Sequence, residues 1–184
     1  VDTFLARESR WDPRQHDVLD GAAGMALIAL ALHRRTDDPR LSALATRLGE
    51  GLLASAERTP HGLQWPLHSM QKAVTGFAHG SSGVAYALAE IGRASGQTRF
   101  LDAAAEALAQ DDSEFNETLS LWRDTRTEGE HYALGWCNGA AGFLLARAAC
   151  WDLLDETRRA RARAAFRRCC IWFDRSRDDS LCHG

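Results

Sequence analysis

The sequence lacks a hydrophobic run long enough to cross a membrane. The longest apolar stretch, from Ala22 to Leu32, is interrupted by Gly24 and ends in His33-Arg34-Arg35. A membrane-spanning helix needs roughly 18 apolar residues or more. No signal peptide is recognisable at the start of the chain, where residue 1 is Val. We therefore expect a protein that does not require a membrane.

An excess of basic residues is also missing. The 22 lysines and arginines are outnumbered by 25 aspartates and glutamates, which gives a formal net charge of -3. A net negative charge provides no general attraction to nucleic acid or to anionic lipid. Nucleic acid is therefore not an expected partner.

Cysteine is scarce and odd in number, with five in 184 residues, all in the second half of the chain. A secreted disulfide framework would show an even set of half-cystines. In a reducing compartment, cysteine serves the core, a metal site or catalysis, so we expect a cytoplasmic protein. Three of the cysteines lie on apolar faces of predicted helices, where a buried structural thiol is expected: Cys150, Cys169 and Cys170.

One glycine phrase occurs three times, and its first glycines are 59 residues apart both times. The three copies are Gly21-Ala22-Ala23-Gly24, Gly80-Ser81-Ser82-Gly83 and Gly139-Ala140-Ala141-Gly142. An apolar helical run follows each copy, and after a break comes a more amphipathic helix. No stretch alternates with the period of two that is typical of strands. The chain is therefore predicted to be all-α.

The two helices of each unit differ in predicted exposure, because the first is apolar nearly all round and the second has a polar face. Inner and outer helices that alternate in this way predict an α/α toroid or solenoid with two concentric layers. The chain holds three units and the opening of a fourth, Cys182-His183-Gly184, which are too few to close a ring. We therefore expect residues 1–184 to form one partial domain, an incomplete toroid that lacks repeats on both sides.

Side chains that bind metals stand one or two positions before the first glycine of the later phrases: His79, Cys137 and the pair Cys182-His183. Repeat symmetry predicts that they meet at one end of the barrel. Two thiolates and an imidazole are typical of a catalytic zinc with an open fourth position, although His79 as a fourth ligand would close the site. A thiol that entered the open position would be deprotonated and still nucleophilic. Such a site favours thiol alkylation over amide hydrolysis.

Taken in order, these segments resemble the motifs of LanC-type lanthionine cyclases, over nearly the whole chain. The matching segments are Asp17-Val18-Leu19-Asp20-Gly21-Ala22-Ala23-Gly24, Phe77 to Leu88 with His79-Gly80, Trp136-Cys137-Asn138-Gly139-Ala140-Ala141-Gly142 and Ser180-Leu181-Cys182-His183-Gly184. A fifth, Trp122-Arg123-Asp124-Thr125-Arg126, is similar to a segment of the cyclase domains of bifunctional (LanM-type) lanthipeptide synthetases. The resemblance implies an α/α toroid, and it favours the C-terminal cyclase part of a bifunctional synthetase over a stand-alone cyclase.

The reaction that the resemblance implies is a Michael-type addition of a peptide Cys thiol to dehydroalanine or dehydrobutyrine, which forms a thioether ring. Its substrate would be a dehydrated lanthipeptide precursor peptide. Cys137, Cys182 and His183 would bind Zn²⁺, and His79 would protonate the enolate. Asp17 would take the thiol proton or orient a neighbouring group.

Three positions depart from the family pattern: Ala141 replaces the usual Pro, Asn138 replaces a frequent His or Tyr, and Ala133 stands where some cyclases have Arg. Two other functions fit a similar toroid. A non-catalytic cyclase-like protein would bind peptides or glutathione, and turnover would distinguish it. A carboxylate-based glycosidase would need an acidic pair and none of the predicted zinc ligands.

Overall fold

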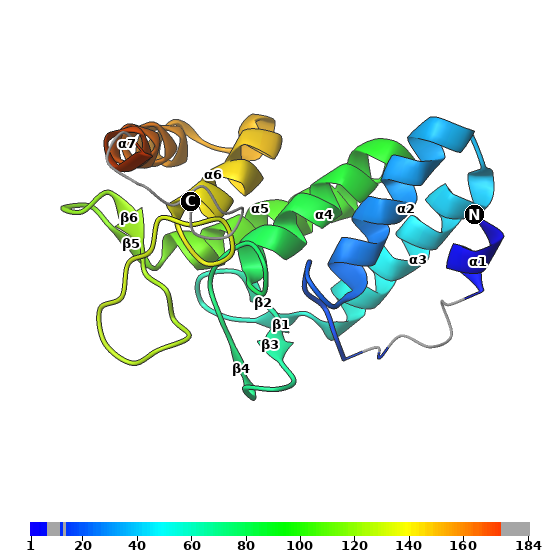
Figure 1. Cartoon of the computed structure of the whole chain (residues 1–184), viewed down its shortest axis with the longest axis horizontal. Helices are drawn as coiled ribbons and strands as arrows, with labels where there is room; N and C mark the ends of the chain where they lie inside the picture. Colours follow the sequence, from blue (N-terminus) through cyan, green and yellow to red (C-terminus); the bar gives the residue numbers. More distant parts are fainter. Residues whose placement is uncertain (7–11, 13, 174–184) are drawn as a thin grey trace.

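The computed structural model describes residues 1–6, 12 and 14–173, and these residues form a helical protein (Figure 1). Three consecutive helix pairs make up most of it: α2 (Ala22–Thr36) with α3 (Pro39–Ser55), α4 (Ser81–Ser95) with α5 (Thr98–Asp112), and α6 (Ala140–Ala149) with α7 (Glu156–Phe173). A short helix, α1 (Asp2–Leu5), precedes them, and a 3₁₀ turn, η2 (Trp151–Leu153), separates α6 from α7. The all-α prediction is confirmed.

Inner and outer helices alternate as the sequence predicted. The inner helix α4 is packed by α2 and α3 on one side and by α5 and α6 on the other, and most of its residues are buried. The outer helices bury a single stripe, as α3 does with Leu41, Leu44 and Leu52. Among the described helices, none combines the length and the apolar character that crossing a bilayer requires.

Three short antiparallel ribbons lie in the connections between an outer helix and the next inner helix. They pair β1 (Glu57–Arg58) with β2 (Leu63–Gln64), β3 (Pro66–Leu67) with β4 (Lys72–Ala73), and β5 (Phe115–Asn116) with β6 (Leu121–Trp122). The sequence did not predict them, because strands of two residues are too short to show an alternating pattern. They stiffen the long loops that lead to α4 and α6.

The second glycine of each phrase is required by close packing against the preceding turn. A Cβ atom on Gly24, Gly83 or Gly142 would lie 1.9 to 2.0 Å from a backbone carbonyl oxygen. This oxygen belongs each time to the residue six positions earlier: Val18, Phe77 and Trp136. Only glycine permits this approach. The three phrases are therefore the same turn built three times.

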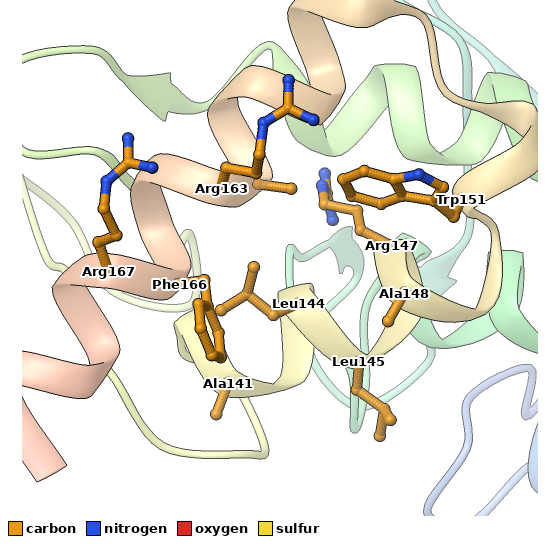
Figure 2. Close-up of a pocket in the computed structure, with 10 residues that line it drawn as sticks. Ala141, Leu144, Leu145, Arg147, Ala148, Trp151, Arg163, Phe166 and Arg167 are labelled. Carbon is orange, nitrogen blue, oxygen red and sulfur yellow. The ribbon is translucent and has the colours of Figure 1, made fainter.

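An apolar groove of about 530 Å³ lies between α6 and α7 (Figure 2). Leu144, Ala148 and Phe166 line it. The residues of α4 that correspond to Leu144 and Ala148, Ala85 and Ala89, are fully buried, and α4 packs against α6. In the described part of the chain, the third unit thus leaves open a face that the earlier units cover with the next inner helix. This is the arrangement of an incomplete α/α toroid.

Candidate functional site

The turns that precede α2, α4 and α6 are joined by main-chain hydrogen bonds. The carbonyl oxygen of Ala78 accepts from the N–H groups of Val18 and Leu19 at 3.1 and 3.2 Å. One repeat later, the carbonyl oxygen of Cys137 accepts from the N–H groups of Phe77 and Ala78 at 3.0 and 2.8 Å. These bonds form a ladder that links equivalent turns and brings the starts of the three inner helices together.

His79 and Asp17 lie on neighbouring turns of this ladder and contact each other. Nδ1 of His79 lies 2.7 Å from Oδ2 of Asp17, although the two residues are 62 positions apart in the sequence. The Asp17 side chain is 7% exposed and that of His79 is 27% exposed. The other carboxylate oxygen of Asp17 accepts the backbone N–H of Asp20 at 2.7 Å. Asp17 is thus held from behind while the imidazole stays accessible.

This contact defines which imidazole nitrogen is available for chemistry. In a neutral His79, the hydrogen bond places the proton on Nδ1, facing the carboxylate. Nε2 is then the nitrogen that can accept or donate a proton. The arrangement is that of a general acid or base oriented by a carboxylate. The sequence predicted both residues, and the structure brings them together.

Cys137 lies on the adjacent turn, half-buried, three positions before the first residue of α6. The other two predicted zinc ligands, Cys182 and His183, lie outside the described residues. Within the described part of the chain, three metal-binding side chains do not cluster. Cys137 fits the predicted donor set by its chemistry and its place, and the zinc site as a whole stays a prediction.

The remaining described cysteines are structural or peripheral. Cys150 and Cys169 are buried as predicted, and burial raises the pKa of these thiols to about 12 and about 11. The prediction that Cys170 lies on a buried face is wrong, because its side chain is exposed. The helix α7 buries one narrow stripe, Ala162, Ala165 and Cys169, and the next position points away from it.

A buried polar network, which the sequence did not predict, joins the inner helices behind the site. Arg147 of α6 is 0% exposed, and its Nη2 donates to Oδ1 of Asp112 at 2.5 Å. Its Nη1 donates to Oγ of Ser82 at 3.1 Å, and its guanidinium lies 4.2 Å from the centre of the Trp122 ring. Ser82 follows His79 by three residues. The network therefore fixes α6, which follows Cys137, against α4, which follows His79.

Asp111 completes this network from the end of α5. Its Oδ2 accepts the backbone N–H of Ser82 at 3.0 Å and the Ser82 hydroxyl at 2.5 Å. Burial raises the pKa of the Asp111 carboxyl to about 7, although Arg147 and Ser82 act in the opposite direction. Asp111 is thus a titratable group at the N-terminus of the helix that His79 precedes.

A half-buried ion pair also borders the site. Arg126 donates to Asp124 through Nε at 3.0 Å and through Nη2 at 2.6 Å. Burial opposes ionisation of Asp124, but hydrogen bonds from the side chain and backbone of Arg126 outweigh it and hold the pKa of the carboxyl below its usual range. Both residues belong to the segment Trp122 to Arg126. Only the resemblance of this segment to cyclase domains pointed to them in the sequence.

The fold and the site define a helical-repeat protein with a histidine–aspartate pair and a cysteine at one end of its inner helices. A family model described as "Lanthionine synthetase C-like protein" matches residues 2–184, and the chain therefore belongs to the lanthionine synthetase C-like family. A search of curated proteins gives no match. At the level of the family, this membership supports a cyclase-type enzyme that binds a modified peptide.

Proposed function

We propose that this chain carries out the zinc-dependent cyclisation of a dehydrated lanthipeptide precursor, adding Cys thiols to dehydroalanine or dehydrobutyrine to form thioether rings. The observation that carries the proposal is the ladder of turns. It brings His79, Asp17 and Cys137 to adjacent places at one end of the inner helices, in a member of the lanthionine synthetase C-like family.

Cys137, Cys182 and His183 are the proposed zinc ligands. In the sequence, Cys182 stands two positions before Gly184, as Cys137 stands two positions before Gly139. The ladder, extended by one repeat, would bring the turn of Cys182 and His183 against that of Cys137. When bound, the zinc ion would supply the Lewis acidity that keeps a thiol deprotonated near neutral pH.

His79 is the proposed proton-transfer group. In the reaction, a bond forms between the thiol sulfur and the β-carbon, and the alkene π electrons move to the amide oxygen as an enolate. The α-carbon then takes up one proton, so the reaction is balanced without an oxidant or reductant. Nε2 of His79 can accept the thiol proton and return it to the α-carbon, since Asp17 at Nδ1 stabilises the imidazolium that forms in between. Asp17 is then the group that orients His79.

The cyclase is further proposed to be the C-terminal part of a bifunctional synthetase that acts in the cytoplasm. Support comes from the segment Trp122-Arg123-Asp124-Thr125-Arg126 and from the odd number of cysteines.

The test combines metal content with ring formation in the full-length protein. Zinc stoichiometry is measured in the wild type, in Cys137→Ala and in the control Cys170→Ala, which removes an exposed thiol on α7. Ring formation is followed as loss of alkylatable thiols in a dehydrated precursor peptide. One zinc per chain, lost in Cys137→Ala and kept in Cys170→Ala, is expected.

His79→Ala should retain zinc and lose most of its ring-forming rate, because a positioned general acid or base contributes about 10²- to 10⁴-fold. Normal ring formation by His79→Ala would contradict its role. A wild-type protein that binds the precursor without turnover would instead indicate a non-catalytic peptide-binding protein.

A further inference from the structure

The carboxamide of Asn138 is buried directly beside Cys137. Asn138 is 2% exposed. With the carboxamide oriented to satisfy both of its ends, its nitrogen donates to the carbonyl oxygen of Cys137 at 3.3 Å, and its oxygen accepts from Nη1 of Arg126 at 2.9 Å. The opposite orientation would set oxygen against oxygen and nitrogen against nitrogen. The side chain of Asn138 therefore connects Arg126 to the turn that carries Cys137.

Arg126 is itself held in a fixed geometry. The guanidinium of Arg126 donates two parallel hydrogen bonds to the carboxylate of Asp124, at 3.0 and 2.6 Å. The backbone N–H of Arg126 donates a third to the same carboxylate at 3.0 Å. Asp124 is 5% exposed, so the pair is anchored from inside the protein. A bidentate pair of this kind fixes direction as well as distance, which a lysine in the same place would not do.

The loop that carries Arg126 is clamped to the segment that leads to His79. The N–H of Thr75 donates to Oγ1 of Thr125 at 3.0 Å, and Oγ1 of Thr75 accepts the N–H of Thr125 at 3.2 Å. Nζ of Lys72 donates to the carbonyl oxygens of Thr125 and Arg126 at 3.0 and 3.1 Å. These bonds hold the loop of Arg126 against the segment that leads to His79.

The carbonyl oxygen of Cys137 is the point where these contacts converge. It accepts the N–H groups of Phe77 and Ala78 from one side and the Asn138 carboxamide from the other. Asn138 also holds the repeat position that His79 holds one unit earlier, since both directly precede the first glycine of their phrase. In the second unit this position carries His79, the proposed proton-transfer group. In the third unit it carries Asn138, whose side chain donates a hydrogen bond to the carbonyl oxygen of the preceding residue, Cys137.

We propose that Asp124, Arg126 and Asn138 form a hydrogen-bonded chain that positions Cys137 as a metal ligand. The inference rests on the proposed function for the role of Cys137, whereas the chain of contacts does not depend on it. Groups that orient a metal ligand from behind change metal affinity by about 10- to 100-fold when they are replaced. Asp124, Arg126 and Asn138 are therefore positioning residues in this proposal.

The test compares Arg126→Gln with Arg123→Gln in the full-length protein. Arg123 is a matched control, because it lies on the same loop, is similarly exposed and forms its own ion pair with Glu114. Two properties are measured: the zinc dissociation constant, by competition with a chromophoric chelator, and the hydrogen-exchange rates of the Phe77 and Ala78 amides in the metal-free protein. Arg126→Lys tests whether the two parallel hydrogen bonds of the guanidinium to Asp124 are needed. Asn138→Asp keeps an oxygen that accepts from Arg126 but removes the N–H group that donates to the carbonyl oxygen of Cys137.

Arg126→Gln and Asn138→Asp are expected to weaken zinc binding about 10- to 100-fold and to speed exchange of the two amides about tenfold, the loss of roughly one net hydrogen bond. Arg126→Lys should resemble Arg126→Gln, and Arg123→Gln should resemble the wild type. Wild-type zinc affinity and wild-type amide exchange in Arg126→Gln would overturn the proposal, as would equal losses in Arg123→Gln. If the wild type binds no zinc while the amides of Arg126→Gln exchange faster, the positioning chain stands and the proposed zinc function fails.

Discussion

Replacing Arg147 by Met should destabilise the protein strongly, because it breaks a buried ion pair from one side. Arg147 is fully buried and contacts Asp112, Ser82 and the carbonyl oxygen of Phe143. Methionine fills a similar length with apolar atoms, so the main loss is electrostatic. The carboxylate of Asp112 would remain in the core with Trp122 Nε1 at 2.9 Å and Arg158 Nε at 3.3 Å.

The expected cost follows from this burial. Removing one partner of a buried ion pair lowers the free energy of unfolding by about 3–5 kcal/mol. For a chain of this size, that loss corresponds to a decrease in Tm of roughly 6–20 °C. The loss of the Arg147 contact with the Trp122 ring belongs to the same change and is included in this range.

Urea unfolding, followed by far-UV circular dichroism and by tryptophan fluorescence, measures the effect. The control is Arg163→Met on α7, where the arginine side chain is 46% exposed and pairs with Glu156 at the surface. Surface pairs contribute about 0–1 kcal/mol, so this variant should unfold like the wild type.

The double variant Arg147→Met with Asp112→Asn removes both charges and keeps an amide oxygen that can accept from Trp122 Nε1. Because no unpaired charge stays in the core, the double variant should recover most of the loss. A single variant within about 1 kcal/mol of the wild type, or a double variant less stable than the single one, would refute the reasoning. If Arg147→Met does not fold at all, the double variant still decides, because it is expected to fold.

Local features of the sequence were sufficient to predict the helix pairs, whereas Asp17 was named only through the resemblance to LanC-type cyclases, and its contact with His79 came from the structure. The phrase Gly80-Ser81-Ser82-Gly83 marks a turn that only glycine permits, and the period of 59 residues repeats this turn in space. Residues about 59 positions apart in the sequence therefore lie on neighbouring turns in the structure. The same reasoning placed Cys137 on the adjacent turn.

Features that depend on contacts between different loops could not be predicted. Arg147 stands in the last turn of an apolar helix, where a basic residue is usually a solvated end group, and only the tertiary fold buries it against Asp112. The contact between Arg126 and Asn138 likewise joins a ribbon loop to a repeated turn, and the repeat pattern gives no position for the loop. Such contacts become visible only when the loops have been placed.

Three further substitutions probe the turn of α4, the helix α3 and the titration of Asp111. Gly83→Ala should lower the free energy of unfolding by about 1–3 kcal/mol, because the new Cβ would meet the carbonyl oxygen of Phe77. Gly51→Ala, whose Cβ would meet nothing within 4 Å in the helix α3, should instead stabilise by about 0.4–1 kcal/mol, and urea unfolding measures both changes. The Asp111 carboxyl has a pKa raised from 3.8 to about 7 by burial, so the folded state holds a proton that the unfolded state releases between these values. Stability contributed by this group is therefore present at low pH and declines as pH rises towards 7. Asp111→Asn should remove this dependence, so its stability relative to the wild type should rise from pH 5 to pH 7 and stay level above pH 8. A difference between the two proteins that is constant with pH would show that Asp111 is ionised throughout this range.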